Sequence, residues 1–135
     1  MNTKEALNFL LGLLSNFRVH KRFIEELAAL LKKDLKGKEK RFFKAMATQL
    51  ENIRNFGVMV HTVDNNEKIH ALDGHFYSIH LQQSQFNVRF LIYIFDNGTA
   101  YFLNAFYERS GKKSSDYTHN TKVLNQRLKE LKEEN

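Results

Sequence analysis

The stretch FNVRFLIYIFDNGTAYFLNAFY, residues 86–107, decides the fold of this 135-residue chain. Its two aromatic-rich, β-branched runs flank Asn97-Gly98, a dipeptide that favours a tight turn because both residues tolerate a positive φ. We therefore predict two strands joined as a hairpin. The first strand is apolar on both faces apart from Asn87 and Arg89, which is typical of a central strand.

Helical and strand periodicities surround this hairpin. Apolar residues recur at helical spacing in the N-terminal part and again near the C-terminus, and between these parts the hydrophobic period changes from 3.6 to 2. The expected helices cover residues 3–16, a segment ending at Gly37, a segment from Lys38 to Gly57, and residues 115–135. The expected strands cover residues 68–72, 75–81, 86–95 and 101–107, with 58–63 as an edge strand or a loop.

This order of elements predicts an α+β fold. N-terminal helices precede a small antiparallel sheet of roughly three to five strands, and a C-terminal helix packs on that sheet. We expect a single domain over residues 1–135, with a helical part at 1–56, the sheet at 57–114 and the last helix at 115–135. The sequence has no proline and no low-complexity linker that would mark a domain boundary.

Composition excludes several classes of protein. The chain contains no cysteine, which excludes a disulfide scaffold and thiolate chemistry and indicates a reducing compartment. No apolar run approaches the roughly 20 residues that span a bilayer. We therefore expect a cytoplasmic protein with no membrane partner. Glycine-rich phosphate loops, Cys/His metal sets and nucleophile elbows are missing from the sequence, so we expect neither a metal nor another cofactor.

The formal net charge of +6 is unevenly distributed. The first 56 residues hold twelve Lys/Arg against six Asp/Glu. Within this part, the stretch from Lys32 to Lys44 is strongly basic, and it forms either a solvated surface or an RNA-facing patch. The candidate RNA-binding residues in this stretch are Lys36, Lys38, Lys40 and Arg41.

Arg89 is the most informative single side chain, because an unpaired guanidinium in an apolar strand costs several kcal/mol. It reaches either a carboxylate, from Glu108 or Asp96, or the rim of the sheet, or a phosphate. Arg109 and the pair Lys112-Lys113 follow the hairpin and precede a helix N-terminus, where partial positive charge adds to the attraction for anions. They form either a solvated loop or an anion site shared with Arg89.

Residues 86–113 resemble the C-terminal half of the HigB-like, phage-derived branch of the RelE/ParE toxin superfamily. The matching features are the strand RFLIYIF, a second apolar strand that ends in Phe, a basic segment and a helix. Residues 72–80, LDGHFYSIH, resemble the family's Leu-x-Gly-x-x-Tyr-Glu-Leu-Arg strand. Ser78 and His80 replace the usual Glu and Arg of that strand, and Glu108 replaces a lysine. The family opens with an edge strand, for which residues 18–20 are the candidate.

The resemblance implies the toxin component of a type II toxin–antitoxin pair, a ribosome-associated mRNA endoribonuclease that cleaves RNA by metal-independent attack of its 2′-OH. It implies a phosphate site made by Arg89, Arg109, Lys112 and Lys113. His80 or Glu108 would exchange protons, and Tyr107 would stack on a base or donate a proton. The implied partners are mRNA on the ribosome and a cognate acidic antitoxin.

Two other functions remain open. The chain is alternatively a ParE-like toxin that binds and inhibits gyrase, or an inactive family member that serves as a binding module. The first helix is apolar on more than one face, so it either mediates a homodimer or caps the sheet edge where the family's first strand lies.

Overall fold

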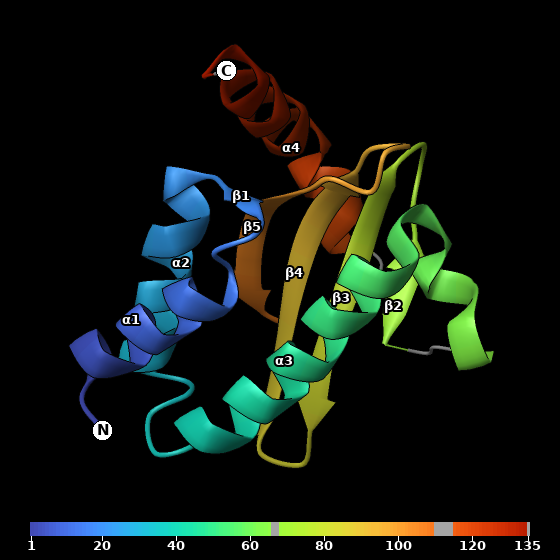
Figure 1. Ribbon diagram of the computed structural model, residues 1–135. Coiled ribbons are helices and arrows are strands. Elements are labelled where there is room, and N and C mark those ends of the chain that lie inside the picture. Colours follow the sequence, from blue (N-terminus) through green and yellow to red (C-terminus); the bar gives the residue numbers. More distant parts are fainter. Residues whose placement is uncertain (66–67, 110–114, 135) are drawn as a thin grey trace.

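The sheet of this protein is covered by helices on both faces. The computed structural model describes residues 1–65, 68–109 and 115–134. Strand order in the five-stranded sheet is β1-β5-β4-β3-β2, with α1, α2 and α3 on one face and α4 on the other (Figure 1). The predicted α+β class is therefore confirmed. The elements are α1 (Thr3–Leu13), β1 (Arg18–Val19), α2 (Lys21–Lys32), α3 (Glu39–Phe56), the 3₁₀ helix η1 (Gly57–Asn65), β2 (Ile69–Ala71), β3 (Phe76–Gln83), β4 (Phe86–Ile94), β5 (Ala100–Tyr107) and α4 (Ser115–Glu133).

The sheet is mixed. Strands β2 to β5 form an antiparallel meander, in which His80 of β3 lies opposite Arg89 of β4. β1 pairs in parallel with β5 through Arg18 and Val19. This edge strand lies within residues 18–20, the candidate offered by the resemblance, although the part around it was predicted to be helical. The predicted antiparallel sheet therefore has one parallel pair. A run of two residues is too short to show a strand period in the sequence.

Residues 57–65 form η1, so the prediction of an edge strand or a loop in this segment is wrong. Gly57 ends α3 with a φ of +53°, and a Cβ on it would lie 3.3 Å from Gly98 Cα in the hairpin turn. The Tyr77 hydroxyl of β3 donates to the Val58 carbonyl oxygen at 2.9 Å, which fastens η1 to the sheet. Burial raises the pKa of Tyr77, and the phenol therefore stays a hydrogen-bond donor.

The alternating side chains of the strands form two separate apolar clusters. On the side of α1 to α3, the ring of Phe90 meets those of Phe23, Phe42 and Phe102 edge to face. On the other side, Leu91 lies in a cluster to which α4 contributes Leu124, Leu128 and Leu131. β4 is therefore buried on both faces, as its uninterrupted apolar sequence predicts.

Helix α1 packs against α2 and α3 and buries Ala6 and Leu10. β1, and not α1, lies beside β5, so the expectation that the first helix caps the sheet edge is wrong. Phe9 is half exposed and stacks on Phe43 of α3, with ring centres 4.7 Å apart. The homodimer through this helix stays a prediction.

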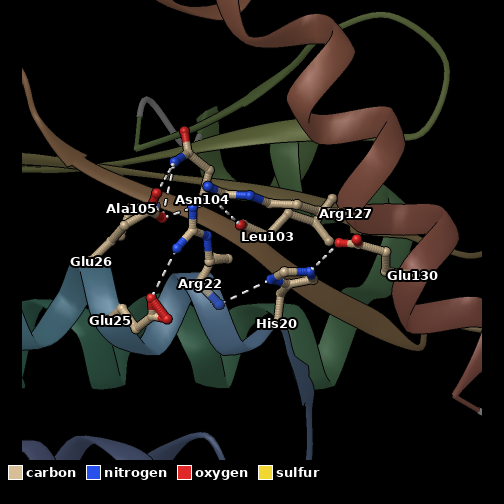
Figure 2. Close-up of polar contacts among 9 residues, drawn as sticks. All are labelled: His20, Arg22, Glu25, Glu26, Leu103, Asn104, Ala105, Arg127 and Glu130. Atoms are coloured by element: carbon tan, nitrogen blue, oxygen red, sulfur yellow. Dashed lines mark hydrogen bonds and ion pairs between the residues drawn. The ribbon is translucent and has the colours of Figure 1, made fainter.

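A bulge in β5 is tied to both α2 and α4 (Figure 2). Asn104 pairs with Leu91 and Phe102 with Ile92, which leaves Leu103 as an extra residue. Beside it, Glu26 of α2 accepts hydrogen bonds from Asn104 Nδ2, Ala105 N and Arg127 Nη1, each at 3.0 Å. Arg127 of α4 also donates to the Leu103 carbonyl oxygen at 2.8 Å. One carboxylate therefore joins the edge of β5 to both covering helices.

His20 makes a second link between α2 and α4 (Figure 2). Its Nδ1 accepts from the Arg22 backbone N–H at 3.0 Å, which caps the N-terminus of α2. Its other ring nitrogen, Nε2, donates to Glu130 Oε1 at 2.7 Å. The hydrogen bond from His20 is the main cause that lowers the pKa of Glu130. Both ring nitrogens of the buried His20 are thus engaged in hydrogen bonds.

The Phe90→Ala variant tests the aromatic cluster. Phe90 is fully buried and touches three other rings, so its loss should lower the free energy of unfolding by about 3–5 kcal/mol. The matched control is Phe9→Ala, which removes the same ring from a position 50% exposed and should cost about 1 kcal/mol. Urea denaturation followed by circular dichroism measures both values. Equal losses would contradict the packing described for Phe90.

The Glu130→Gln variant tests the link between α4 and His20. Because the pKa of Glu130 is lowered from its ordinary 4.5, its carboxylate stabilises the fold above that pH. This contribution disappears as the pH falls through the lower folded-state pKa. Glu130→Gln should therefore be less stable than the unmodified protein near neutral pH, and the difference should shrink in acid. Denaturation at a series of pH values measures it.

The control for this pH series is Glu133→Gln, which removes the same charge from an exposed position of the same helix. It corrects for the effect of net charge on stability. If the Glu130→Gln difference persists unchanged in acid, the ionised Glu130–His20 hydrogen bond is not its cause.

Candidate functional site

Polar side chains form a row across one end of the sheet, on the face that α4 partly covers. We call this set the polar row: His70 of β2, His80 of β3, Arg89 of β4 and Glu108 just after β5. The rings of His70 and His80 stack, with centres 4.2 Å apart and planes 16° from parallel. His80 lies directly opposite Arg89, and the Glu108 N–H donates to the Asn87 carbonyl oxygen, which extends the pairing of β4 with β5. Three of the predicted catalytic residues, His80, Arg89 and Glu108, are thus brought together.

The Arg89 guanidinium forms a buried ion pair with Glu108. Nε of Arg89 contacts Oε2 of Glu108, and the two side chains are 12% and 0% exposed. Of the alternatives left open by the sequence, the carboxylate partner is therefore the one observed. Asp96, the other candidate carboxylate, lies instead beside His75, with Oδ1 3.4 Å from Nε2. If one member of a buried ion pair is removed, the other is left as an uncompensated buried charge. Both Arg89 and Glu108 are therefore needed for stability.

Two further buried polar atoms lie on the same face as the polar row. Ser78 Oγ and Asn87 Oδ1 make no hydrogen bond within the described part of the chain. Ser78 lies two residues before His80, and Asn87 lies two residues before Arg89, so both side chains project to the same face as the row. This end of the sheet therefore carries buried polar atoms without hydrogen-bond partners among the described residues, a feature that is common at functional sites.

A basic groove opens beside the row, between α3 and the edge of β3. β2 pairs with β3 only at residues 77–79, so residues 81–83 of β3 have no strand of the described sheet on their outer side. The groove has a volume of about 490 Å³. Its polar lining residues are Arg41, Lys44, Thr48, Gln49, Lys68, His80, Gln82 and Gln83. Three permanent cations around an open strand edge favour the approach of an anionic ligand to this groove.

His80 belongs to both features. It lines the basic groove and is the member of the polar row nearest to it in the sheet. The backbone N–H of His80 donates to the Lys68 carbonyl oxygen, so Lys68, the residue before β2, lies next to His80. His80 therefore links the strand edge that borders the groove to the Arg89–Glu108 pair on the α4 face.

Tyr107 and Arg109 lie away from this site. Tyr107 pairs with Val88 and packs against the cluster under α1 to α3, which is the opposite face from Arg89. Arg109 lies over the Tyr107 ring, 4.4 Å from its centre, and Arg109 Nη2 is 3.1 Å from Asp34 Oδ1. Arg89 is paired with Glu108 and Arg109 with Asp34, so the structure does not bring the two guanidinium groups to one site.

The predicted RNA-binding lysines are only partly at the groove. Arg41 lines it and donates to Gln85 Oε1 at 2.5 Å. The ammonium of Lys38 donates to the backbone carbonyl oxygens of Asp34 and Gln85 and so fastens the β3–β4 turn to the helices. Lys36 and Lys40 are exposed. Lys112 and Lys113 lie outside the described residues.

Among the Lys, Arg and His residues of the groove and the row, three are absent from the predicted site residues, namely Lys44, Lys68 and His70, although Lys44 ends the basic stretch noted in the sequence. Lys44 follows Arg41 at the spacing of one helical turn, so the helix period of α3 was a sufficient signal for it. Lys68 and His70 approach His80 only through the pairing of β2 with β3. Strand register is a property of the folded sheet, and their spacing in the sequence carries no sign of it.

Within the described ranges, no group of three His, Asp or Glu side chains gathers closely enough to hold a metal ion. Over the same ranges, no helix is long and apolar enough to cross a membrane. No protein-family model, curated protein or solved structure matches the chain.

A double-mutant cycle tests the buried ion pair. Arg89→Met leaves the Glu108 carboxylate buried without its partner, and it should lower the free energy of unfolding by about 3–5 kcal/mol. Adding Glu108→Leu removes the second charge and should restore most of that loss. Urea denaturation of the single and double variants gives the coupling energy.

The exposed pair Arg22–Glu25 supplies the control cycle, since its side chains are 61% and 58% exposed. Arg22→Met with Glu25→Leu should show a coupling below about 1 kcal/mol. A coupling between Arg89 and Glu108 as small as this would mean that the pair is solvated in solution.

Proposed function

We propose that the protein is the toxin component of a type II toxin–antitoxin pair and cleaves mRNA on the ribosome, as its resemblance to the HigB-like branch of the RelE/ParE superfamily implies. The order of elements supports this proposal. β1 is an edge strand that precedes the helices α2 and α3, and an antiparallel meander and a C-terminal helix follow. The leading helix α1 stands outside this pattern.

The position of His80 carries the proposal. Cleavage through the 2′-OH requires an acceptor for its proton, cations that stabilise the crowded phosphate, and a donor for the leaving 5′ oxygen. His80 lines a groove with Arg41, Lys44 and Lys68, and it lies opposite Arg89. A phosphate bound where the groove reaches the edge of β3 would therefore lie among cations and next to the strand that carries this imidazole.

The contacts of the arginines change the roles inferred from the resemblance. Glu108 is engaged by Arg89 inside the protein, so we assign it to orienting that guanidinium rather than to proton transfer. Arg109 and Tyr107 face the other side of the sheet and are left out of the reacting group. We assign the phosphate-binding role to Arg41, Lys44 and Lys68, which line the groove together with His80, the residue opposite Arg89.

The partners follow from this assignment. The basic groove would receive the backbone of single-stranded mRNA, and the exposed lysines at 36 and 40 would contact ribosomal RNA. An acidic antitoxin would inhibit the protein by covering the same cations. Action on translating mRNA would take place in the cytoplasm.

An inactive binding module is the second candidate. The observation that favours it is the neutralisation of both arginines, since Arg89 is paired with Glu108 and Arg109 with Asp34. A protein of this kind would keep the groove and bind RNA or a partner without cleaving it.

Expression of the chain alone in bacteria tests the choice. An active toxin should stop translation and leave mRNA fragments with 2′,3′-cyclic phosphate and 5′-hydroxyl ends, which sequencing of RNA termini detects. The double change Lys44→Gln with Lys68→Gln should weaken binding to single-stranded RNA and lower its log–log salt slope by about two. Fluorescence anisotropy at several salt concentrations measures that slope.

The matched control is Lys4→Gln with Lys129→Gln, which removes the same net charge from exposed positions outside the groove. Intact mRNA with continued translation would reject the toxin proposal, and RNA binding that depends on the groove would then support the binding module. Intact mRNA together with DNA damage would indicate a gyrase inhibitor. Equal salt slopes for the two double variants would place RNA binding elsewhere.

A further inference from the structure

We propose that His70 and His80 act as a pair in the cleavage step, with His80 as the general base and His70 as the general acid. This inference rests on the proposed ribonuclease function. Nothing in the sequence distinguishes His70 from the other five histidines, because it is defined by its place in the folded sheet.

The first support is the geometry of the two rings. They stack 4.2 Å apart and 16° from parallel, so they present matching edges to the same region of the surface. In an in-line displacement, the attacking 2′ oxygen and the leaving 5′ oxygen lie on opposite sides of one phosphorus atom. Two parallel imidazoles from neighbouring strands can reach both oxygens of a single phosphate at their edge, whereas histidines on opposite faces could not.

The second support is the distribution of positive charge. Lys68 lies next to His80 through the backbone hydrogen bond between them, and Arg41 and Lys44 of α3 line the same groove at the edge of β3. These cations would hold the non-bridging oxygens of the phosphate, whose charge increases as the fifth bond to phosphorus forms. The groove would therefore fix the scissile group at the edge of β3, the strand that carries His80.

Exposure decides which ring has which role. His80 is half-buried on β3 and lines the groove, so it is placed to receive the proton of a 2′-OH held there. His70 is exposed on the outer strand β2 and is not among the residues that line the groove. We therefore assign protonation of the departing oxygen to His70.

The proposed step balances without a metal or an added reactant. His80 takes the proton of the 2′-OH as the 2′ oxygen forms its bond to phosphorus. The bond from phosphorus to the 5′ oxygen breaks, and the protonated His70 delivers its proton to that oxygen. The products are a 2′,3′-cyclic phosphate and a 5′-hydroxyl, and exchange with water restores both imidazoles to their starting states.

A change of leaving group tests the assignment. The substrate is a short RNA, offered free and on ribosomes, whose scissile 5′ oxygen is replaced by sulfur. A thiolate leaves without help from an acid, so this substrate bypasses the role assigned to His70. With ordinary RNA, His70→Asn should slow cleavage about 100-fold or more, and with the sulfur-containing RNA it should cleave near the unmodified rate. His80→Asn should be slow on both.

The control variant is His75→Asn, which removes a histidine that also stacks on an aromatic ring, that of Tyr93, but lies at the other end of β3. It should cleave both RNAs at the unmodified rate. Circular dichroism and RNA anisotropy on each variant separate loss of chemistry from loss of fold or of binding.

The outcomes are distinct. If the unmodified protein cleaves neither RNA, the proposed function itself fails. If it cleaves and His70→Asn cleaves equally well, the stacked ring has a packing role alone and the inference is overturned. It is also overturned if His70→Asn is slow on both RNAs, since the sulfur leaving group would then have given no rescue.

Discussion

The structure depends on one constraint, which is that strand β4 carries apolar side chains on both of its faces. A strand of this kind is stable only when both faces are removed from water. Helices α1 to α3 cover one face around Phe90, and α4 covers the other around Leu91. The requirement for α4 explains why so many polar contacts, at Glu26, Arg127 and His20, are used to hold it against the sheet edge.

The same constraint determines the state of Arg89. It is one of two polar residues in β4, and its side chain is almost covered. Water does not solvate the guanidinium fully at this position, so a carboxylate from the end of the next strand compensates its charge. A functional arginine in such a place acts through nitrogens that the carboxylate leaves unused, and Glu108 then sets its direction.

Local patterns predicted much of the fold, because helices and long strands leave periodic traces in the sequence. The hairpin around Asn97-Gly98, the strands of the meander and the four α-helices all follow from such traces. β1 and η1 do not, since two residues of parallel strand and a 3₁₀ segment have no distinctive period. Their positions are set by tertiary contacts, with β5 in one case and with Tyr77 in the other.

The candidate site was predictable to the extent that its residues share a strand or a helix. Arg89 was recognisable as an exception within an apolar run, and Glu108 as a candidate for its partner. The sequence grouped Arg109 with Arg89, whereas the structure places Arg109 beside Asp34 and Tyr107, just beyond the end of β5. The approach of Lys68 and His70 to His80 depends on the register of a three-residue strand, which no local feature reveals.

The carboxylate of Glu26 also makes the two edges of the sheet differ in their capacity to pair with another strand. It occupies the outward-facing N–H of Ala105, a donor through which a strand of another molecule would otherwise extend the sheet. On the far side, β2 ends early and leaves residues 81–83 of β3 next to positive charge. Strand pairing with another molecule is therefore disfavoured at Ala105. At the other edge, two lysines and an arginine would repel a second copy of the chain. One helix residue and a few cations thus disfavour aggregation through both edges of the sheet.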